Sequence, residues 1–229
     1  MKISYTQRLR ALIVLLVVGL LGASACASLN KKEEGAIIGA AAGGAVGGVI
    51  GNQTGSTARG AIIGAVVGGT AGAIIGHQMD QQAKELSQNI PGATVARVGE
   101  GIAVTFASGL LFAFDSDQIL PAAGTNLSEL AKSLQKYPDS QLLIVGHTDN
   151  VGDASYNQRL SERRSNSAAT YLAAHGVART RLAATGKGES EPVATNETDA
   201  GRQQNRRVEV AIYASEAYRQ RLLKSNTGD

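Results

Sequence analysis

The chain has 229 residues, enough for one or two domains, and its composition is that of a folded protein apart from 28 glycines and only 4% aromatic residues. The formal net charge is +3, but three of the 22 basic residues, Lys2, Arg8 and Arg10, lie in an N-terminal stretch that we expect to be removed. The remaining basic residues balance the 19 acidic ones. Such a mature chain lacks the basic face that binds a phosphate backbone, so nucleic acid is not an expected partner.

Residues 1–25 are typical of a secretory signal peptide. A basic start is followed by an uncharged run over residues 11–21 and then by small residues before Cys26. The uncharged run is too short to cross a bilayer. Cys26 is the only cysteine, so no disulfide can form within the chain.

The segment LGASAC, which ends at Cys26, resembles a bacterial lipobox, with Ala23 where that motif most often has Leu. The resemblance implies that Cys26 becomes the N-terminal residue and is acylated with fatty acids such as palmitate, with the rest of residues 26–34 as a spacer. Ala27 and Ser28 follow the cysteine in place of the Asp that is typical of inner-membrane lipoproteins, which implies the outer membrane. The alternative is a free thiol after ordinary signal cleavage.

An internal duplication follows the spacer: GAIIGAAAGGAVGGVIGNQ from Gly35 is echoed by GAIIGAVVGGTAGAIIGHQ from Gly60. Glycine recurs at every fourth position, which on an α-helix makes a stripe without side chains along one face. Each copy would form a helix roughly 25 Å long, close to the thickness of a thin outer membrane. We therefore interpret residues 35–78 as a glycine-zipper helical hairpin that packs on itself or on other copies, at or in the membrane. The alternative is a flexible Gly/Ala-rich spacer.

Residues 102–214 alternate strand and helix patterns and predict a single core. Apolar or alternating runs predict strands over residues 102–106, 142–145, 182–185 and 208–212, and helical periodicity predicts helices between Pro121 and Pro138 and over residues 155–175. The expected fold is α/β, of the α+β kind, with helices packed on one mixed sheet. Residues 79–101, broken at Pro91-Gly92, are interpreted as a linker, and residues 215–229 as a C-terminal tail.

Three motifs in the predicted domain resemble a known family. They are FAFDSD from Phe112, GHTDNVG from Gly146 with Asn157, Leu160, Ser161 and Arg164 after it, and NRRVEV from Asn205. Together they resemble the OmpA-like C-terminal domain, over about residues 104–213. Signal, lipobox, glycine zipper and this domain in series are similar to the YiaD-type lipoproteins of that superfamily. The resemblance implies a periplasmic domain that binds peptidoglycan without covalent attachment.

The resemblance implies a binding site made of Asp149, Arg164, Asp115, Ser116, Asn157 and Leu160. The side chain of meso-diaminopimelate, in the peptide stem, ends in an ammonium beside a carboxylate. We expect Asp149 to take the ammonium and Arg164 to fork onto the carboxylate. Ser116 and Leu160 are expected to offer backbone groups, and Asn157 to order the loop through its side chain. Without the resemblance, Asp149 and Arg164 would be interpreted as a structural ion pair.

Two other functions remain open from the residues alone. A peptidoglycan hydrolase or zinc amidase could use His147 and Asp149, although no set of three zinc ligands, no cysteine nucleophile and no nucleophile elbow is evident. We therefore expect no enzymatic activity, no metal and no cofactor. The second alternative is a membrane-structural protein in which the glycine zipper forms oligomers or pores. Arg206 and Arg207 are expected to pair with acidic residues, and Arg207 is expected at the rim of the site.

Overall fold

The computed structural model describes residues 55–227. Several predictions concern residues outside that part: the signal peptide, the acylated Cys26 with its spacer, and the first glycine-rich copy. The hairpin as a whole therefore stays a prediction. Only the second copy and the domain after it lie within the described residues.

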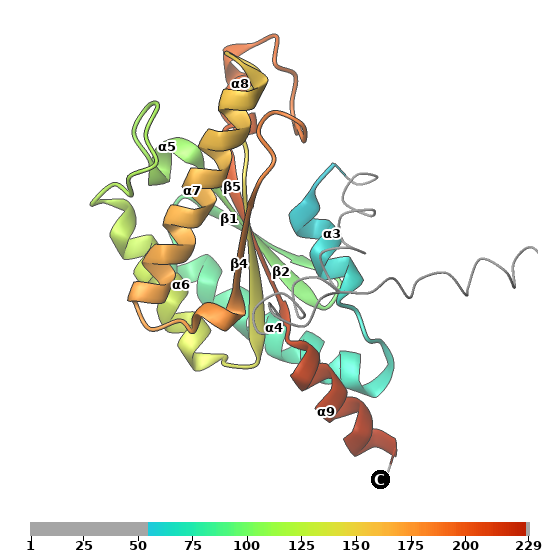
Figure 1. Ribbon diagram of the computed structural model, residues 1–229. Coiled ribbons are helices and arrows are strands. Elements are labelled where there is room, and N and C mark those ends of the chain that lie inside the picture. Colours follow the sequence, from blue (N-terminus) through green and yellow to red (C-terminus); the bar gives the residue numbers. More distant parts are fainter. Residues whose placement is uncertain (1–54, 228–229) are drawn as a thin grey trace, which may run out of the picture. The chain divides into compact units, whose positions relative to one another are not determined.

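A five-stranded sheet organises the described residues, and helices pack on both of its faces (Figure 1). In chain order the elements are α3 (Thr57–Gly64), α4 (Gly69–Asn89), β1 (Ala93–Val98), β2 (Gly101–Ala107), α5 (Ser108–Leu111), α6 (Ala123–Lys136), β3 (Ser140–Gly146), α7 (Ala154–Ala174), the short 3-10 helix η1 (Arg179–Arg181), β4 (Leu182–Gly186), α8 (Asp199–Asn205), β5 (Arg207–Ala214) and α9 (Glu216–Thr227).

The sheet is mixed, as predicted. Its strand order is β1-β2-β5-β3-β4, with β3 and β4 parallel and the other neighbours antiparallel. The parallel pair is joined by α7, because parallel strands need a long crossover. Since β3 runs into α7 at one end of the sheet, the loop of residues 147–153 lies at the carboxyl end of a buried strand.

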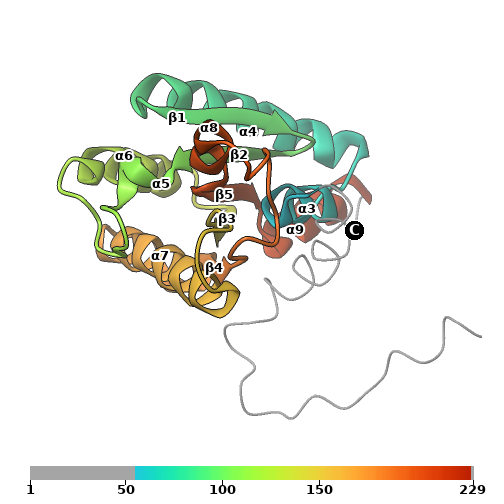
Figure 2. The same ribbon diagram turned by 90° about the horizontal axis from the view of Figure 1, so that it is seen from above.

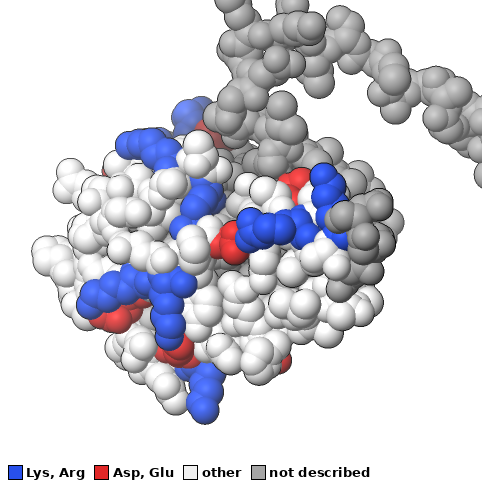
Figure 3. All heavy atoms as spheres, turned by 90° about the horizontal axis from the view of Figure 1, so that it is seen from below, with Lys and Arg blue, Asp and Glu red and all other residues white. Residues whose placement is uncertain are grey.

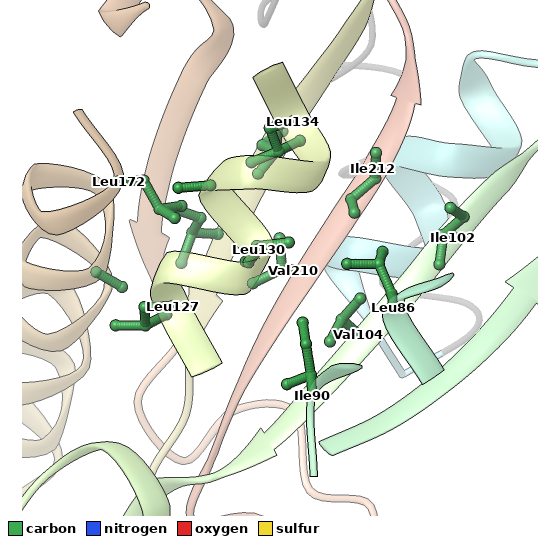
Figure 4. Close-up of a cluster of buried hydrophobic side chains, with 14 of the residues drawn as sticks. Leu86, Ile90, Ile102, Val104, Leu127, Leu130, Leu134, Leu172, Val210 and Ile212 are labelled. Carbon is green, nitrogen blue, oxygen red and sulfur yellow. The ribbon is translucent and has the colours of Figure 1, made fainter. Parts of the chain in front are cut away.

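One face of the sheet carries the larger apolar core. Alternate residues of the strands point to it, among them Ile102, Val104, Val210 and Ile212, and α4, α6 and α7 cover them (Figures 2 and 4). Leu127, Leu130 and Leu134 of α6 recur at helical spacing, and each is at most 1% exposed. The predicted core positions of these strands and of α6 are confirmed.

The opposite face is covered by α3 (Figure 2). The intervening residues of β3 and β5, such as Leu143, Val145 and Tyr213, form a second apolar cluster with α3. In that cluster Ala58, Ala61 and Ile62 are each at most 1% exposed. The start of the second glycine-rich copy is therefore part of the domain core.

The second copy does not form the single continuous helix that was predicted. It divides into α3 and α4, and the backbone turns at Gly68 and Gly69, where φ is +75° and +61°. These angles suit glycine, because they lie in the left-handed region. The carboxylate of Glu100 accepts hydrogen bonds from the amides of Val67, at 2.9 Å, and Gly68, at 2.8 Å, at the N-terminus of α4. A Cβ at Gly72 would clash with Oε1 of Glu100, so this glycine makes room for the cap.

Regular structure extends into the segments that were interpreted as linker and tail. The linker contains the second half of α4 and all of β1, and the tail contains α9. A further helix, α8, lies between β4 and β5. α4 packs against β1, α6 and α9, so the domain extends on both sides of residues 102–214. Within residues 55–227 no helix combines the length and the apolar character needed to cross a membrane.

Charged side chains of both signs share the surface. On the face seen in Figure 3, Lys and Arg side chains lie beside Asp and Glu. Ion pairs link neighbouring elements, as Lys136 of α6 does with Glu85 of α4 and Arg221 of α9 with Asp139 before β3. Such exposed pairs contribute little stability, so the apolar clusters carry the fold.

The packing of α3 predicts how two neighbouring isoleucines contribute to the free energy of unfolding. Ile62 is 1% exposed and Ile63 is 40% exposed. Ile62→Ala should lower the free energy of unfolding of the full-length protein by about 2–5 kcal/mol, because it opens a cavity between α3 and the sheet. Ile63→Ala should change it by about 0.5 kcal/mol or less. Chemical denaturation followed by circular dichroism measures both, and equal small effects would contradict the docking of α3.

Candidate binding site

A pocket opens at the end of the sheet where β3 runs into α7. In Figure 1, α5 and α8 lie at this end of the sheet. The volume of the pocket is about 290 Å³. It is lined by Phe114, Asp115, Thr148, Asp149, Val151, Tyr156, Asn157, Leu160, Arg164, Arg202 and Arg206. Five of the six residues predicted from the resemblance line it, and Ser116 lies directly behind it.

Asp149 is held at the floor of the loop that follows β3. It is 8% exposed, and its Oδ1 accepts a hydrogen bond from the amide of Val151 at 3.1 Å. Its Oδ2 forms an ion pair with Arg206. The amide of Thr148, one residue earlier, donates to the carbonyl of Gly188 at 2.9 Å. These contacts fix the carboxylate in place while one side of it faces the pocket.

Arg164 reaches the same pocket from α7. Its Nε donates to the carbonyl of Ser116 at 2.8 Å and its Nη2 to the carbonyl of Ala113 at 3.4 Å, and its guanidinium lies over the ring of Phe112. The side chain is 6% exposed, and burial lowers its pKa. Across residues 55–227 no carboxylate comes close enough to Arg164 to form an ion pair. Asp149 and Arg164 therefore face one pocket but do not pair with each other.

Asn157 orders the loop, as predicted. Its Nδ2 donates to the carbonyls of Asp149, at 3.3 Å, and Val151, at 3.2 Å, and to the carboxylate of Glu189, at 2.8 Å. Helix α7 begins just before it, where the carboxylate of Asp153 accepts hydrogen bonds from the first backbone amides. The shape of the loop is thus set by Asn157 of α7 together with Asp153, the last residue of the loop.

The turn before α6 supplies the other wall. Asp115 has a φ of +54°, unusual for a residue other than glycine, and its carboxylate accepts a hydrogen bond from the hydroxyl of Tyr156. The backbone carbonyl of Ser116 accepts from Arg164, and its amide donates to the carbonyl of Ala113 at 3.2 Å. Ser116 therefore supports Arg164 instead of offering backbone groups to the pocket. Leu160 lies within α7, so it contributes its side chain, since its backbone groups belong to the helix.

Sequence reasoning missed several residues of the pocket. Arg206 lines it, whereas Arg207, expected at the rim, does not: it is 3% exposed and pairs with Glu209. Successive residues entering a strand point to opposite sides, which is why only one of the two reaches the pocket. Arg202 comes from α8, which had no clear signal in its polar segment. Phe114, 99% exposed, stands at the mouth.

His147 lies behind the pocket, between two carboxylates. It is 1% exposed, its ring nitrogens have no hydrogen-bond partner among the described residues, and each lies 4.0 Å from a carboxylate oxygen, one of Glu191 and one of Glu209. Burial, assisted by the charge of Arg207, lowers the pKa of His147 to about 3. Among residues 55–227 no group of three His, Cys, Asp or Glu side chains could hold a metal ion.

Comparison with known proteins connects this geometry to a family. The family model described as OmpA family matches residues 111–206, and the one described as YMGG-like Gly-zipper matches residues 5–80. The probable lipoprotein YiaD of Escherichia coli is 34% identical over 136 residues, and the outer-membrane lipoprotein YfiB of Pseudomonas aeruginosa is 38% identical over 115 residues. These matches cover 58% and 50% of the chain.

The matched region makes up a different share of each relative. The chain covers 68% of YfiB and 62% of YiaD, but 32% of the outer membrane porin F of Pseudomonas fluorescens, with which it is 43% identical over 103 residues. Among solved structures, the cell wall anchor of the T6SS from Pseudomonas aeruginosa is similar with a TM-score of 0.50 and 30% identity, over 61% of this chain and 96% of that one. The match to the OmpA family model includes every residue that lines the pocket.

The buried His147 generates a prediction about pH. In the folded protein its pKa is about 3, whereas the ordinary value is 6.5, so as pH falls below that value the unfolded chain binds a proton that the folded protein does not. Stability should therefore fall with decreasing pH, with a limiting slope of about 1.4 kcal/mol per pH unit from this one group.

Denaturation between about pH 7 and pH 5, above the range in which carboxylates titrate, measures this slope. In His147→Asn the slope should flatten, whatever the stability of the variant at pH 7. His77→Asn, which changes an exposed histidine, should keep the pH dependence of the parent. If the slope in His147→Asn equals that of the parent, the inference that His147 is neutral in the folded protein is wrong.

Proposed function

The chain belongs to the OmpA family, and we propose on that premise that it is a non-catalytic outer-membrane lipoprotein whose domain binds the diaminopimelate stem of peptidoglycan. Through an acylated Cys26 it would then hold the outer membrane to the cell wall. The relative YfiB is named an outer-membrane lipoprotein, which supports the proposed location and lipid anchor. The similar T6SS structure is named a cell wall anchor, which supports the proposed binding to the cell wall.

The observation that carries this proposal is the guanidinium of Arg164, which has no counter-ion within residues 55–227 and faces the pocket of Asp149. A buried cation without a contacting counter-ion is costly, because its desolvation is offset by backbone carbonyls, an aromatic ring and the more distant charges of Asp115 and Asp117. A ligand carboxylate would relieve that cost. The end of the diaminopimelate side chain carries a carboxylate and an ammonium on the same carbon, which suits one buried cation and one carboxylate facing a small pocket.

Cys26 and the first glycine-rich copy would lie on the membrane side of the domain. Residues of the second copy are used in the core, since α3 buries Ala58 and Ile62 against the sheet. The buried part of the second copy is therefore not free to form an oligomer. We retain zipper-mediated oligomerisation as a second role that is independent of wall binding.

The pocket generates a binding prediction. Asp149→Ala and Arg164→Ala should each lose roughly thirtyfold or more in affinity for sacculi that contain diaminopimelate, because removing one partner of a desolvated charged contact costs on the order of 2–5 kcal/mol. Cosedimentation with purified sacculi measures the loss. Arg163→Ala is the matched control, because Arg163 is adjacent on α7 but exposed and paired with Asp117.

Since Arg164 is buried, each variant should first be shown to keep its circular-dichroism spectrum and unfolding transition. Stem peptides with lysine in place of diaminopimelate lack the carboxylate and should bind the parent much more weakly, which tests the same contact without any mutation. Folded variants that bind as well as the parent, or equal binding of the two peptides, would place the site elsewhere.

The lipid anchor generates a separate prediction. Cys26→Ala should abolish labelling by a fatty-acid analogue and release the protein from the outer-membrane fraction, because acyl chains provide the attachment. Membrane fractionation and metabolic labelling measure the two effects. Retention of an unlabelled protein in the outer membrane would mean that the glycine-rich copies are the anchor.

A further inference from the structure

Three guanidinium groups and two carboxylates line the pocket. Arg202 is paired with Asp199, which lies outside the lining, and Arg206 is paired with Asp149, whereas Arg164 has no ion-pair partner in the described part of the chain. A ligand ammonium that takes Asp149 would leave Arg206, as well as Arg164, without a carboxylate partner. The occupied pocket therefore suits a ligand with two negative groups.

The three arginines differ in how firmly they are held. Arg164 is tied to two backbone carbonyls, and Arg202 donates to the carbonyl of Asn196 at 2.7 Å and pairs with Asp199. In the described part of the chain, the guanidinium of Arg206 has a single partner, the carboxylate of Asp149, and its side chain is 41% exposed. Arg206 is thus the cation of the pocket that is most free to change partner.

The partner of Arg206 is also the group that the proposed function assigns to the ligand ammonium. An ammonium that approaches Asp149 competes with Arg206 for the same carboxylate, because Oδ1 of Asp149 is already engaged by the amide of Val151. Sharing the carboxylate between two cations weakens the hold on each. A guanidinium released from Asp149 would present a planar fork whose geometry matches a carboxylate.

We propose that Arg206 binds a second carboxylate of the stem peptide when diaminopimelate occupies the pocket. This inference rests on the proposed function. Two groups of the stem have the required chemistry: the α-carboxylate of the glutamate before diaminopimelate and the C-terminal carboxylate of the alanine after it. Arg206 therefore makes the pocket selective for stems in which that carboxylate is free instead of amidated.

Titration calorimetry of the full-length protein with soluble stem tetrapeptides tests the proposal. Three peptides are compared: the unmodified one, one amidated at glutamate and one amidated at the C-terminus. Amidating the carboxylate that Arg206 contacts should weaken binding to the parent about tenfold, the usual scale of one charge-assisted hydrogen bond. The peptide that loses affinity identifies which carboxylate is bound.

Arg206→Gln should remove that difference, so that amidated and unmodified peptides bind the variant equally. The readout is the ratio of the affinities for the unmodified and the amidated peptide. The absolute affinity is less informative, because freeing Asp149 strengthens binding whereas losing the cation weakens it. Arg163→Gln should keep the tenfold difference. The inference is overturned if the parent binds all three peptides equally, or if Arg206→Gln still discriminates among them. Absence of binding of the unmodified peptide to the parent would instead overturn the proposed function, and this inference with it.

Discussion

Strand β5 is buried along its whole length, and much of the structure depends on that constraint. A strand with apolar residues on both sides needs a cover on each face of its sheet. Helices α4, α6 and α7 cover one face, and α3 covers the other. The domain therefore includes chain from before residue 102, and part of a glycine-rich repeat packs on the sheet whose end carries the candidate site.

The elements that the sequence predicted are those with strong local patterns. The buried strands β2, β3 and β5 have continuous or alternating apolar runs, and α6 has regular leucines between two prolines. Helices α8 and α9 are short or mostly polar, so their stability comes from tertiary contacts and caps that no local pattern records. The break at Gly68 and Gly69 depends on Glu100, more than thirty residues later, and repeat symmetry pointed to a continuous helix instead.

The members of the candidate site that belong to the family motifs were predictable, but its additional arginines and its ion pairs were not. Family motifs gave Asp149 and Arg164, and the fold brings both to one pocket. That Asp149 pairs with Arg206, 57 positions away, depends on how β5 enters the sheet. The position of Arg202 depends on α8 in the same way. Contacts of this kind are set by topology, and only the assembled structure shows them.

The way in which the chain enters the domain has a mechanical consequence. Ser56 donates to the buried carboxylate of Glu209, and Thr57 binds that of Glu191 through both its amide and its hydroxyl. In a protein anchored at its N-terminus and bound to the wall, as proposed above, tension along the chain would load these hydrogen bonds. Glu191 lies in the loop between β4 and α8, which also contains Gly188, whose carbonyl accepts a hydrogen bond from the amide of Thr148 beside Asp149. Tension applied from the membrane would thus be transmitted to the pocket through the loop between β4 and α8.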